Sequence, residues 1–384
     1  MVQASHRPRC GLMRRLGKGG QIWLVAIAVS TSVLASAAAA AWPASGSTRT
    51  RMDVPARLGT SAIVRVRARS TTADVGTVLP GTRCPAFPAN NVWNTPITGL
   101  PVDSHSAQWL RSMAAGTTYL HPDYGPGGGA SPYGIPWQIT PPHPRLTKVR
   151  FMYDDQSNPG PYPFSASTPI EGGRRATGDR HALMVDPTTC RLYELYDAHY
   201  HPDNRSTAGS GAIWNLESNH LRPAGWTSAD AAGLPILPGL VNYDEVMSGH
   251  IDHAIRMTAQ LTDAKYIWPA RHEAGAATNP NYPPMGARFR LSASFRLPPS
   301  KCARPCQVVI QAMKTYGLIL ADNGSNWFFQ GTTDRRWTYT MVDQLKQIPA
   351  SAFQAVNESC LMLNPNSGQA LQARTTARKR ACGS

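Results

Sequence analysis

The segment 179–197 holds the residue types best suited to acid–base chemistry, and it alternates polar with apolar residues. Two alternating runs flank a Pro-Thr-Thr turn, which predicts a β-hairpin. His181 on the first predicted strand and Glu194 on the second each lie among apolar neighbours, because side chains two positions apart share a strand face. Titratable groups in such surroundings have shifted pKa values, which is common where a protein does chemistry.

Carboxylates in and beside this hairpin predict glycoside hydrolysis, which needs one carboxyl group as acid and a second as base or nucleophile. Glu194 is the predicted acid or nucleophile, because an apolar and aromatic strand face raises a carboxyl pKa. Glu171, which precedes a Gly-Gly turn, or Asp179, which starts the hairpin, is its predicted partner. His181 and His253 are predicted to position the sugar.

Histidines support two other hypotheses. His181, His253 and His272 come from three separate strand-like segments, and imidazoles that converge from strands can bind a metal ion. An imidazole beside a tyrosine can also act as the base of a polysaccharide lyase. The favoured prediction has no cofactor, and a metal held by these three histidines is the alternative.

Aromatic residues suggest the class of substrate. Flat rings bury apolar area and leave polar groups within reach, which suits sugar rings. The predicted substrate-binding residues are Trp214, Tyr196, Trp268, Arg256 and His272. A serine hydrolase is disfavoured, because the Gly-Ser-Gly at residues 209–211 does not form the strand-to-helix elbow that such enzymes use.

The first 83 residues are predicted to lie outside the folded domain. A basic start, an apolar run at 22–29 and small residues near Ala40 are typical of a secretory signal peptide over 1–40. Residues 41–83 are rich in Ala, Arg, Ser and Thr without a regular period, which predicts a disordered basic arm. The apolar run is shorter than a membrane span, so we expect an extracellular protein without a stable membrane anchor.

The net charge of +15 is uneven along the chain. Basic residues are concentrated before residue 84 and in the tail at 361–384, which leaves the region between them close to neutral. Nucleic-acid binding requires a basic face on the folded domain itself, so no nucleic-acid partner is predicted. The expected partner is a polysaccharide, and the protein is expected to be a monomer.

Six cysteines remain after removal of the signal peptide, and an even number in an exported chain predicts disulfides. Cys302 and Cys306 are suited to close a local loop. A second bond is expected to tie the tail through Cys360 and Cys382, and a third to join Cys84 to Cys190 in the central hairpin. Spacing alone leaves other pairings open.

Residues 84–360 read as one mainly β domain, a sandwich, jelly roll or barrel with a few short helices. Helices are predicted over 104–115, 308–316 and 341–348. Predicted strands lie at 148–153, 212–217, 250–257, 266–272 and 287–295. Asn323-Gly324 predicts a type I′ hairpin over 318–329, and 227–230 resembles a capping box that opens one helical turn.

Several segments together resemble a family of secreted single-domain proteins of actinobacterial-type soil bacteria. The resemblance rests on the segments 91–94, 179–186, 192–198, 250–256 and 316–327. It implies secretion and a single domain, and it carries no reaction with it. The sequence therefore predicts a secreted glycoside hydrolase, with a polysaccharide lyase or a non-catalytic cell-wall or glycan-binding protein as alternatives.

Overall fold

The structure is a computed structural model that describes residues 77–127, 132–203, 205–372, 378 and 381–382. All of them belong to one unit of the chain that begins at Ala68. The predicted signal peptide and most of the predicted arm lie outside the described residues. Strand residues outnumber helical residues, so the prediction of a mainly β fold with short helices is confirmed.

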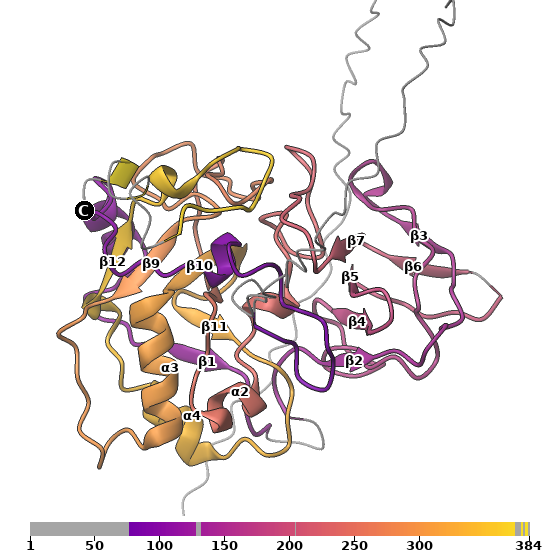
Figure 1. The fold of residues 1–384 in the computed structure, drawn as a ribbon, viewed down its shortest axis with the longest axis horizontal. Coiled ribbons are helices and arrows are strands. Elements are labelled where there is room, and N and C mark those ends of the chain that lie inside the picture. Colours follow the sequence, from indigo (N-terminus) through magenta and orange to yellow (C-terminus); the bar gives the residue numbers. More distant parts are fainter. Residues whose placement is uncertain (1–76, 128–131, 204, 373–377, 379–380, 383–384) are drawn as a thin grey trace, which may run out of the picture. The chain divides into compact units, whose positions relative to one another are not determined.

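The larger sheet has six strands in the order β1-β11-β8-β10-β9-β12 (Figure 1). It is mixed: β8 runs parallel to β10, β1 runs parallel to β11, and the other neighbouring pairs are antiparallel. Its strands are β1 (His121–Asp123), β8 (Ile255–Ala259), β9 (Arg288–Leu291), β10 (Leu318–Asn323), β11 (Phe328–Gln330) and β12 (Phe353–Val356).

The second sheet has four strands in the order β2-β4-β5-β7, and β3 pairs with β6 in a separate parallel ribbon. The predicted central hairpin is confirmed, because β4 and β5 pair in antiparallel register with Leu183 opposite Glu194. The strands of both sets are β2 (Trp137–Ile139), β3 (Val149–Phe151), β4 (Ala182–Asp186), β5 (Arg191–Tyr196), β6 (Ser206–Ala208) and β7 (Ser210–Asn215).

Neither sheet closes on itself, so the predicted sandwich, jelly roll or barrel is not confirmed. Among the described residues the α-helices are α1 (Ser106–Ser112), α2 (Tyr243–Ser248), α3 (Arg304–Thr315) and α4 (Tyr339–Leu345). The 3₁₀ turns are η1 (Val92–Asn94), η2 (Asp154–Gln156), η3 (Leu237–Gly239), η4 (Ala350–Ala352) and η5 (Ser359–Leu361). Within the described part of the chain, no helix has both the length and the apolar character to span a membrane.

The helix α3 begins four residues before the prediction and ends at Thr315, one residue before the predicted end. Gly317 follows it with φ of 73°, a left-handed conformation that glycine adopts without steric cost. A Cβ atom at this position would lie 2.5 Å from the carbonyl oxygen of Phe289. Gly317 therefore allows the chain to turn from α3 into β10 directly beside β9.

The predicted hairpin over 318–329 is wrong, although both of its strands exist. β10 and β11 do not pair with each other, because β8 lies between them and pairs with both. Gly324 instead donates its N–H to the carbonyl of Ala259 at the end of β8. The chain therefore passes over the end of a third strand, which the local Asn-Gly signal cannot encode.

Three other predicted elements are also corrected. The strand expected over 250–257 begins only at Ile255, and 266–272 is irregular apart from a bridge between Tyr266 and Met285. The helical turn expected after 227–230 is not formed. The hydroxyl of Ser228 bonds to Asp230 and to the carbonyl of Leu234, which folds this segment into an irregular loop.

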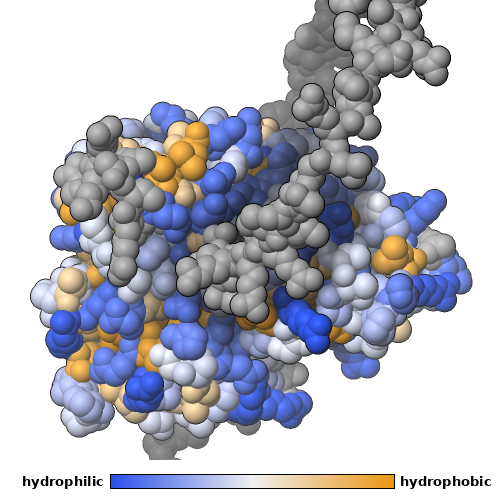
Figure 2. All heavy atoms as spheres, in the orientation of Figure 1, coloured by the Kyte–Doolittle hydropathy of each residue, from blue (hydrophilic) through white to orange (hydrophobic). Residues whose placement is uncertain are grey.

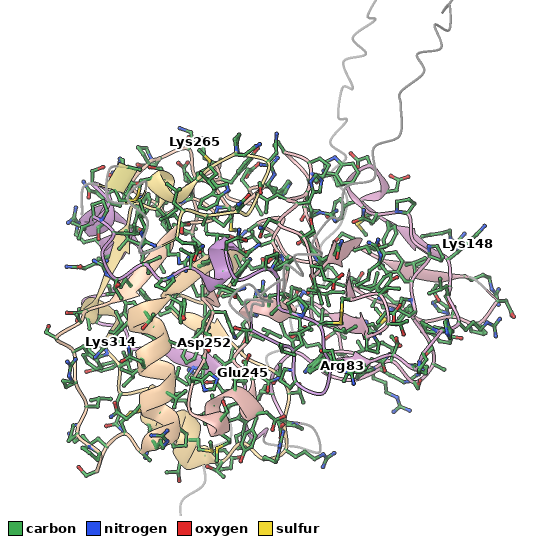
Figure 3. All side chains as sticks on the ribbon, viewed as in Figure 1. Arg83, Lys148, Glu245, Asp252, Lys265 and Lys314 are labelled. Atoms are coloured by element: carbon green, nitrogen blue, oxygen red, sulfur yellow. A yellow bond between two sulfur atoms is a disulfide. The ribbon has the colours of Figure 1, made fainter. Side chains whose placement is uncertain are left out.

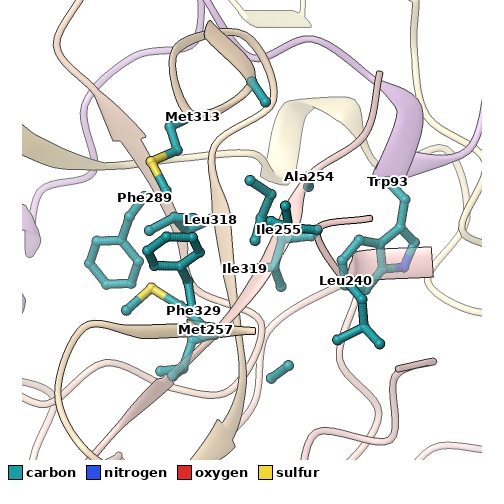
Figure 4. Close-up of a cluster of buried hydrophobic side chains, with 14 of the residues drawn as sticks. Trp93, Leu240, Ala254, Ile255, Met257, Phe289, Met313, Leu318, Ile319 and Phe329 are labelled. Carbon is teal, nitrogen blue, oxygen red and sulfur yellow. The ribbon is translucent and has the colours of Figure 1, made fainter. Parts of the chain in front are cut away.

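One hydrophobic cluster contains residues from both sheets. Figure 4 shows its centre, where Met257, Leu318 and Phe329 of the six-stranded sheet pack together. Leu183 and Leu192 of the central hairpin belong to the same cluster, and the opposite face of the hairpin packs in a second cluster. Figure 2 shows that polar side chains cover most of the face in view, with apolar residues in separate patches.

Three disulfides are present, and they are the three pairs that the sequence favoured: Cys84–Cys190, Cys302–Cys306 and Cys360–Cys382. Cys84 joins the start of the described chain to the turn of the central hairpin. The described part of the predicted tail also packs on the fold, because Gln369 forms a β-bridge with Asn91 and Ser367 forms one with His220.

Candidate functional site

A cleft of about 420 Å³ lies where the ends of β5 and β10 approach each other. Tyr196 is the last residue of β5, and Asp322 lies near the end of β10 after a break in the β8 register. The loop 227–231 forms a further wall. The ionisable and aromatic residues that line the cleft are Tyr153, Asp179, Tyr196, Asp230, His272 and Asp322.

A buried guanidinium group joins two of these carboxylates. Arg256, on β8, is completely buried, and its Nη2 lies 3.2 Å from Oδ2 of Asp230 and 3.7 Å from Oδ2 of Asp322. A buried cation is stable only beside negative partners, so β8 requires carboxylates at this place. The strand register thus brings together three charged groups from separate segments of the chain.

The side chain of Asp230 is fully buried. Its Oδ1 accepts hydrogen bonds from the backbone N–H of Leu234 and from the hydroxyl of Ser228. Burial raises the pKa of Asp230 to about 7, Arg256 opposes this shift, and the charge of Asp322 adds to it. Two carboxylates that share one cation at this depth titrate as a pair, and the pKa of each is raised.

Asp322 is the member of the pair that reaches solvent, with 25% of its side chain exposed. Burial raises its pKa, Arg256 and His181 oppose the shift, and the negative charge of Asp179 adds to it. A carboxyl group with a raised pKa and an open side can donate a proton to a bound molecule.

Asp179, Tyr196 and His272 complete the cleft. The carbonyl of Asp179 accepts the N–H of Asp197, which fixes Asp179 beside the end of β5. The Nδ1 atom of His272 lies 2.8 Å from the carbonyl oxygen of Ala231. A carbonyl only accepts, so Nδ1 carries the proton, and Nε2 of a neutral ring is left as an acceptor.

Buried His181 and partly exposed Glu171 form an ion pair that contacts the cleft wall at Ala229. Nδ1 of His181 lies 2.6 Å from Oε2 of Glu171, and Nε2 donates to the carbonyl of Ala229 at 3.0 Å. Burial opposes a charge on either group, but their mutual hydrogen bond outweighs it. The pKa of His181 is raised and that of Glu171 is lowered. The pair therefore anchors the loop that carries Asp230.

Glu194 lies away from the cleft, in a closed part of the core. Its side chain accepts hydrogen bonds from the N–H groups of Ile236 and Leu237 and from Nε1 of Trp214. Burial raises its pKa, and these three donors oppose the shift. Because Glu194 is fully buried with its oxygens already bonded, it joins β5 to the loop before η3 and does not face a substrate.

His253 is also apart from the cleft, and it is buried. Its Nε2 atom lies 3.3 Å from Oε2 of Glu245 in α2, which Figure 3 labels. Its Nδ1 atom lies 2.8 Å from the carbonyl oxygen of the next residue, Ala254. Across the described residues, no three His, Cys, Asp or Glu side chains are placed to hold a metal ion. The alternative of a metal held by His181, His253 and His272 gains no support.

The structure thus brings together three of the ten predicted site residues in one cleft: Asp179, Tyr196 and His272. Arg256, His181 and Glu171 support the cleft from below, while Trp268 lines a separate groove. Sequence reasoning missed Asp230 and Asp322 as site residues. An arginine in an apolar strand was the signal that could have found them, because a buried cation requires carboxylates nearby.

Comparisons with protein families, with curated proteins and with solved structures find no match to this chain. The resemblance to a secreted soil-bacterial family therefore stays a prediction.

Proposed function

We propose that the protein is a secreted glycoside hydrolase that cleaves a neutral extracellular polysaccharide in the cleft lined by Asp322 and Asp179. The observation that carries the proposal is the arrangement of Asp322 and Asp230 around Arg256, because Asp322 has a raised pKa and is the carboxyl group of the two that reaches solvent. Protonation of the glycosidic oxygen by a carboxylic acid is the step that such enzymes require.

Each group in the cleft has a role in the proposed reaction. Asp322 donates its proton to the glycosidic oxygen as the bond from that oxygen to the sugar carbon breaks. Asp179, which lines the same cleft, acts as the base that deprotonates the attacking water or as the nucleophile. Tyr196 and Tyr153 offer ring surface to the sugar, and Nε2 of His272 accepts a hydrogen bond from a sugar hydroxyl.

The charge of the cleft supports a neutral substrate. Three aspartates line it, and no arginine or lysine stands among the described residues of its wall. Arg256 is buried behind the carboxylates and already neutralised by them. An acidic sugar would meet uncompensated negative charge, which disfavours uronate polymers.

Secretion is part of the proposal. The predicted signal peptide and the three disulfides both support it, because such bonds persist in oxidising compartments.

The test is the release of new reducing ends from a panel of neutral polysaccharides. Asp322→Asn removes the proton donor and should lower the rate by about 10²–10⁴-fold. Asp203→Asn is the matched control, because Asp203 is exposed on a loop outside the cleft, and it should leave the rate unchanged. Full activity in Asp322→Asn, or no cleavage of any polysaccharide by the wild type, would overturn the proposal.

A polysaccharide lyase is the second candidate, and the position of His272 favours it. His272 and Tyr196 line the same cleft, and Nε2 of His272 can take a proton. A lyase product carries an unsaturated uronide that absorbs in the ultraviolet. Such absorbance, lost in His272→Ala and kept in Asp322→Asn, would select the lyase. Retention on a polysaccharide without any cleavage would instead select the non-catalytic glycan-binding alternative.

A further inference from the structure

A second groove, of about 680 Å³, lies on the other side of the segment 268–272. His272 lines the cleft described above, while its neighbour Arg271 and also Trp268 line this groove. Its volume falls within the range of about 300–1,000 Å³ that is usual for ligand sites. We call it the Trp268 groove.

The Trp268 groove presents carbon surface to solvent. Trp268 is half-buried, and its indole N–H is already donated to the carbonyl of Ser367, so the exposed remainder of the ring is apolar. Tyr266 is half-buried beside it, and Ile267 and Met362 are exposed. An apolar patch that combines aromatic rings with a recessed floor is typical of a binding surface.

Two carboxylates in the groove keep an unused hydrogen-bonding oxygen. Asp263 and Glu358 are only 4% and 3% exposed, and among the described residues Oδ1 of Asp263 and Oε1 of Glu358 have no hydrogen-bond partner. Buried polar atoms are nearly always paired in native proteins, so a donor that reaches either oxygen from the groove would be favoured.

The surroundings of Glu358 indicate which kind of donor group would suit it. Its other oxygen binds Arg288 at 3.0 Å, and burial raises its pKa to about 7 although Arg288 opposes the shift. Glu358 can therefore present either a carboxylate or a carboxylic acid near neutral pH. A hydroxyl group suits both states, because it can donate to the first and accept from the second.

The groove carries charges of both signs. Lys265, which Figure 3 labels, and Arg271 line it together with Asp103, so its charge favours neither a cationic nor an anionic occupant. A saccharide combines apolar ring faces with hydroxyl groups and carries no charge. It is the class of ligand that matches the rings of Tyr266 and Trp268 together with the free oxygens of Asp263 and Glu358.

We propose that the Trp268 groove is a second saccharide-binding site, which holds a polysaccharide chain outside the cleft in which cleavage takes place. The inference takes its substrate class from the proposed function, and it rests on that function for this point. Binding in the groove does not require the acid pair, so the two proposals can fail separately.

The experiment measures retention of the full-length Asp322→Asn protein on insoluble cellulose, chitin, mannan and xylan. We expect retention on at least one of them. Addition of Trp268→Ala or of Tyr266→Ala should weaken that retention by about tenfold or more, as for the loss of an aromatic anchor. Trp268→Ala also removes the hydrogen bond from Trp268 to Ser367. Tyr266→Ala keeps this bond, so it tests the groove even where Trp268→Ala fails to fold.

Tyr339→Ala is the matched control, because Tyr339 is 60% exposed on α4 and lies outside the groove. Its retention should equal that of the parent. The inference is overturned if no polysaccharide retains the parent, or if a folded Tyr266→Ala protein is retained as well as Tyr339→Ala. Loss of retention in the groove variants together with full cleavage by Asp322→Asn would instead reject the proposed function and keep the groove.

Discussion

Asp230 and Asp322 share a single cation: Nη2 of Arg256 lies 3.2 Å from Asp230 and 3.7 Å from Asp322. One positive charge cannot compensate two buried carboxylates, so the pKa of Asp230 rises to about 7 and that of Asp322 is also raised. Only Asp322 reaches solvent. In the proposed reaction Asp230 therefore acts only through Arg256 and Asp322 and does not contact the substrate.

The first prediction concerns Asp230→Asn. Loss of its charge leaves Arg256 to Asp322 alone, so the pKa of Asp322 falls. The decline of kcat/KM on the alkaline side should then move to lower pH by roughly one unit, or about 1.4 kcal/mol of differential interaction. A pH profile of polysaccharide cleavage measures this shift. An alkaline limb in the same place as that of the wild type would show that Asp230 does not tune the acid.

The second prediction separates Glu194 from catalysis. In Glu194→Gln, an amide N–H₂ group faces backbone donors that now bind a carboxylate, which should lower the free energy of unfolding by about 1–3 kcal/mol. The cleavage rate per folded molecule should stay near that of the wild type. Urea unfolding together with the reducing-end assay tests both parts. A variant of normal stability without activity would restore the catalytic role that the hairpin pattern suggested.

The third prediction is that the pair of His181 and Glu171 stabilises the protein only within a limited pH range. The raised pKa of His181 means that its contribution is complete below its ordinary value of 6.5 and is lost as pH rises through the raised value. The lowered pKa of Glu171 means that its contribution is present above 4.5 and is lost as pH falls through the lowered value. His181→Gln should therefore destabilise the protein most between these limits, by about 1–3 kcal/mol.

Unfolding curves of the wild type and of His181→Gln across pH measure this window. His199→Gln is the control, because its pair with Asp197 is substantially exposed and should contribute less than about 1 kcal/mol. A stability difference for His181→Gln that does not change with pH would argue against an ion pair.

The fourth prediction compares two disulfides of very different loop length. Cys84–Cys190 spans 106 residues, and Cys302–Cys306 spans four. Loop-closure entropy predicts a cost of about 4–5 kcal/mol for removing the first bond and about 2 kcal/mol for the second. Paired Cys→Ala variants in denaturant unfolding measure both values. Equal losses would show that local packing, rather than chain entropy, dominates.

Features that depend on short segments and on composition could be predicted before the fold was known. Alternation around the Pro-Thr-Thr turn predicted the β4–β5 hairpin, and glycine 317 marked the end of α3. The even number of cysteines and their spacing favoured the three disulfides that form. Each of these signals acts over a few residues or through a covalent bond, so it keeps its meaning without knowledge of the fold.

Which charged groups lie next to each other depends on the order of the strands in the folded protein. Arg256 lies 26 residues from Asp230 in sequence, and β8 brings it to both carboxylates by entering the sheet between β10 and β11. The same insertion replaces the hairpin that Asn323-Gly324 predicted. Strand order depends on which apolar faces can be buried together across the whole core, and a side-chain period of two is the same for every order. The pattern could therefore show that Glu194 lies inside, but not that Asp322 would be the carboxyl group open to solvent.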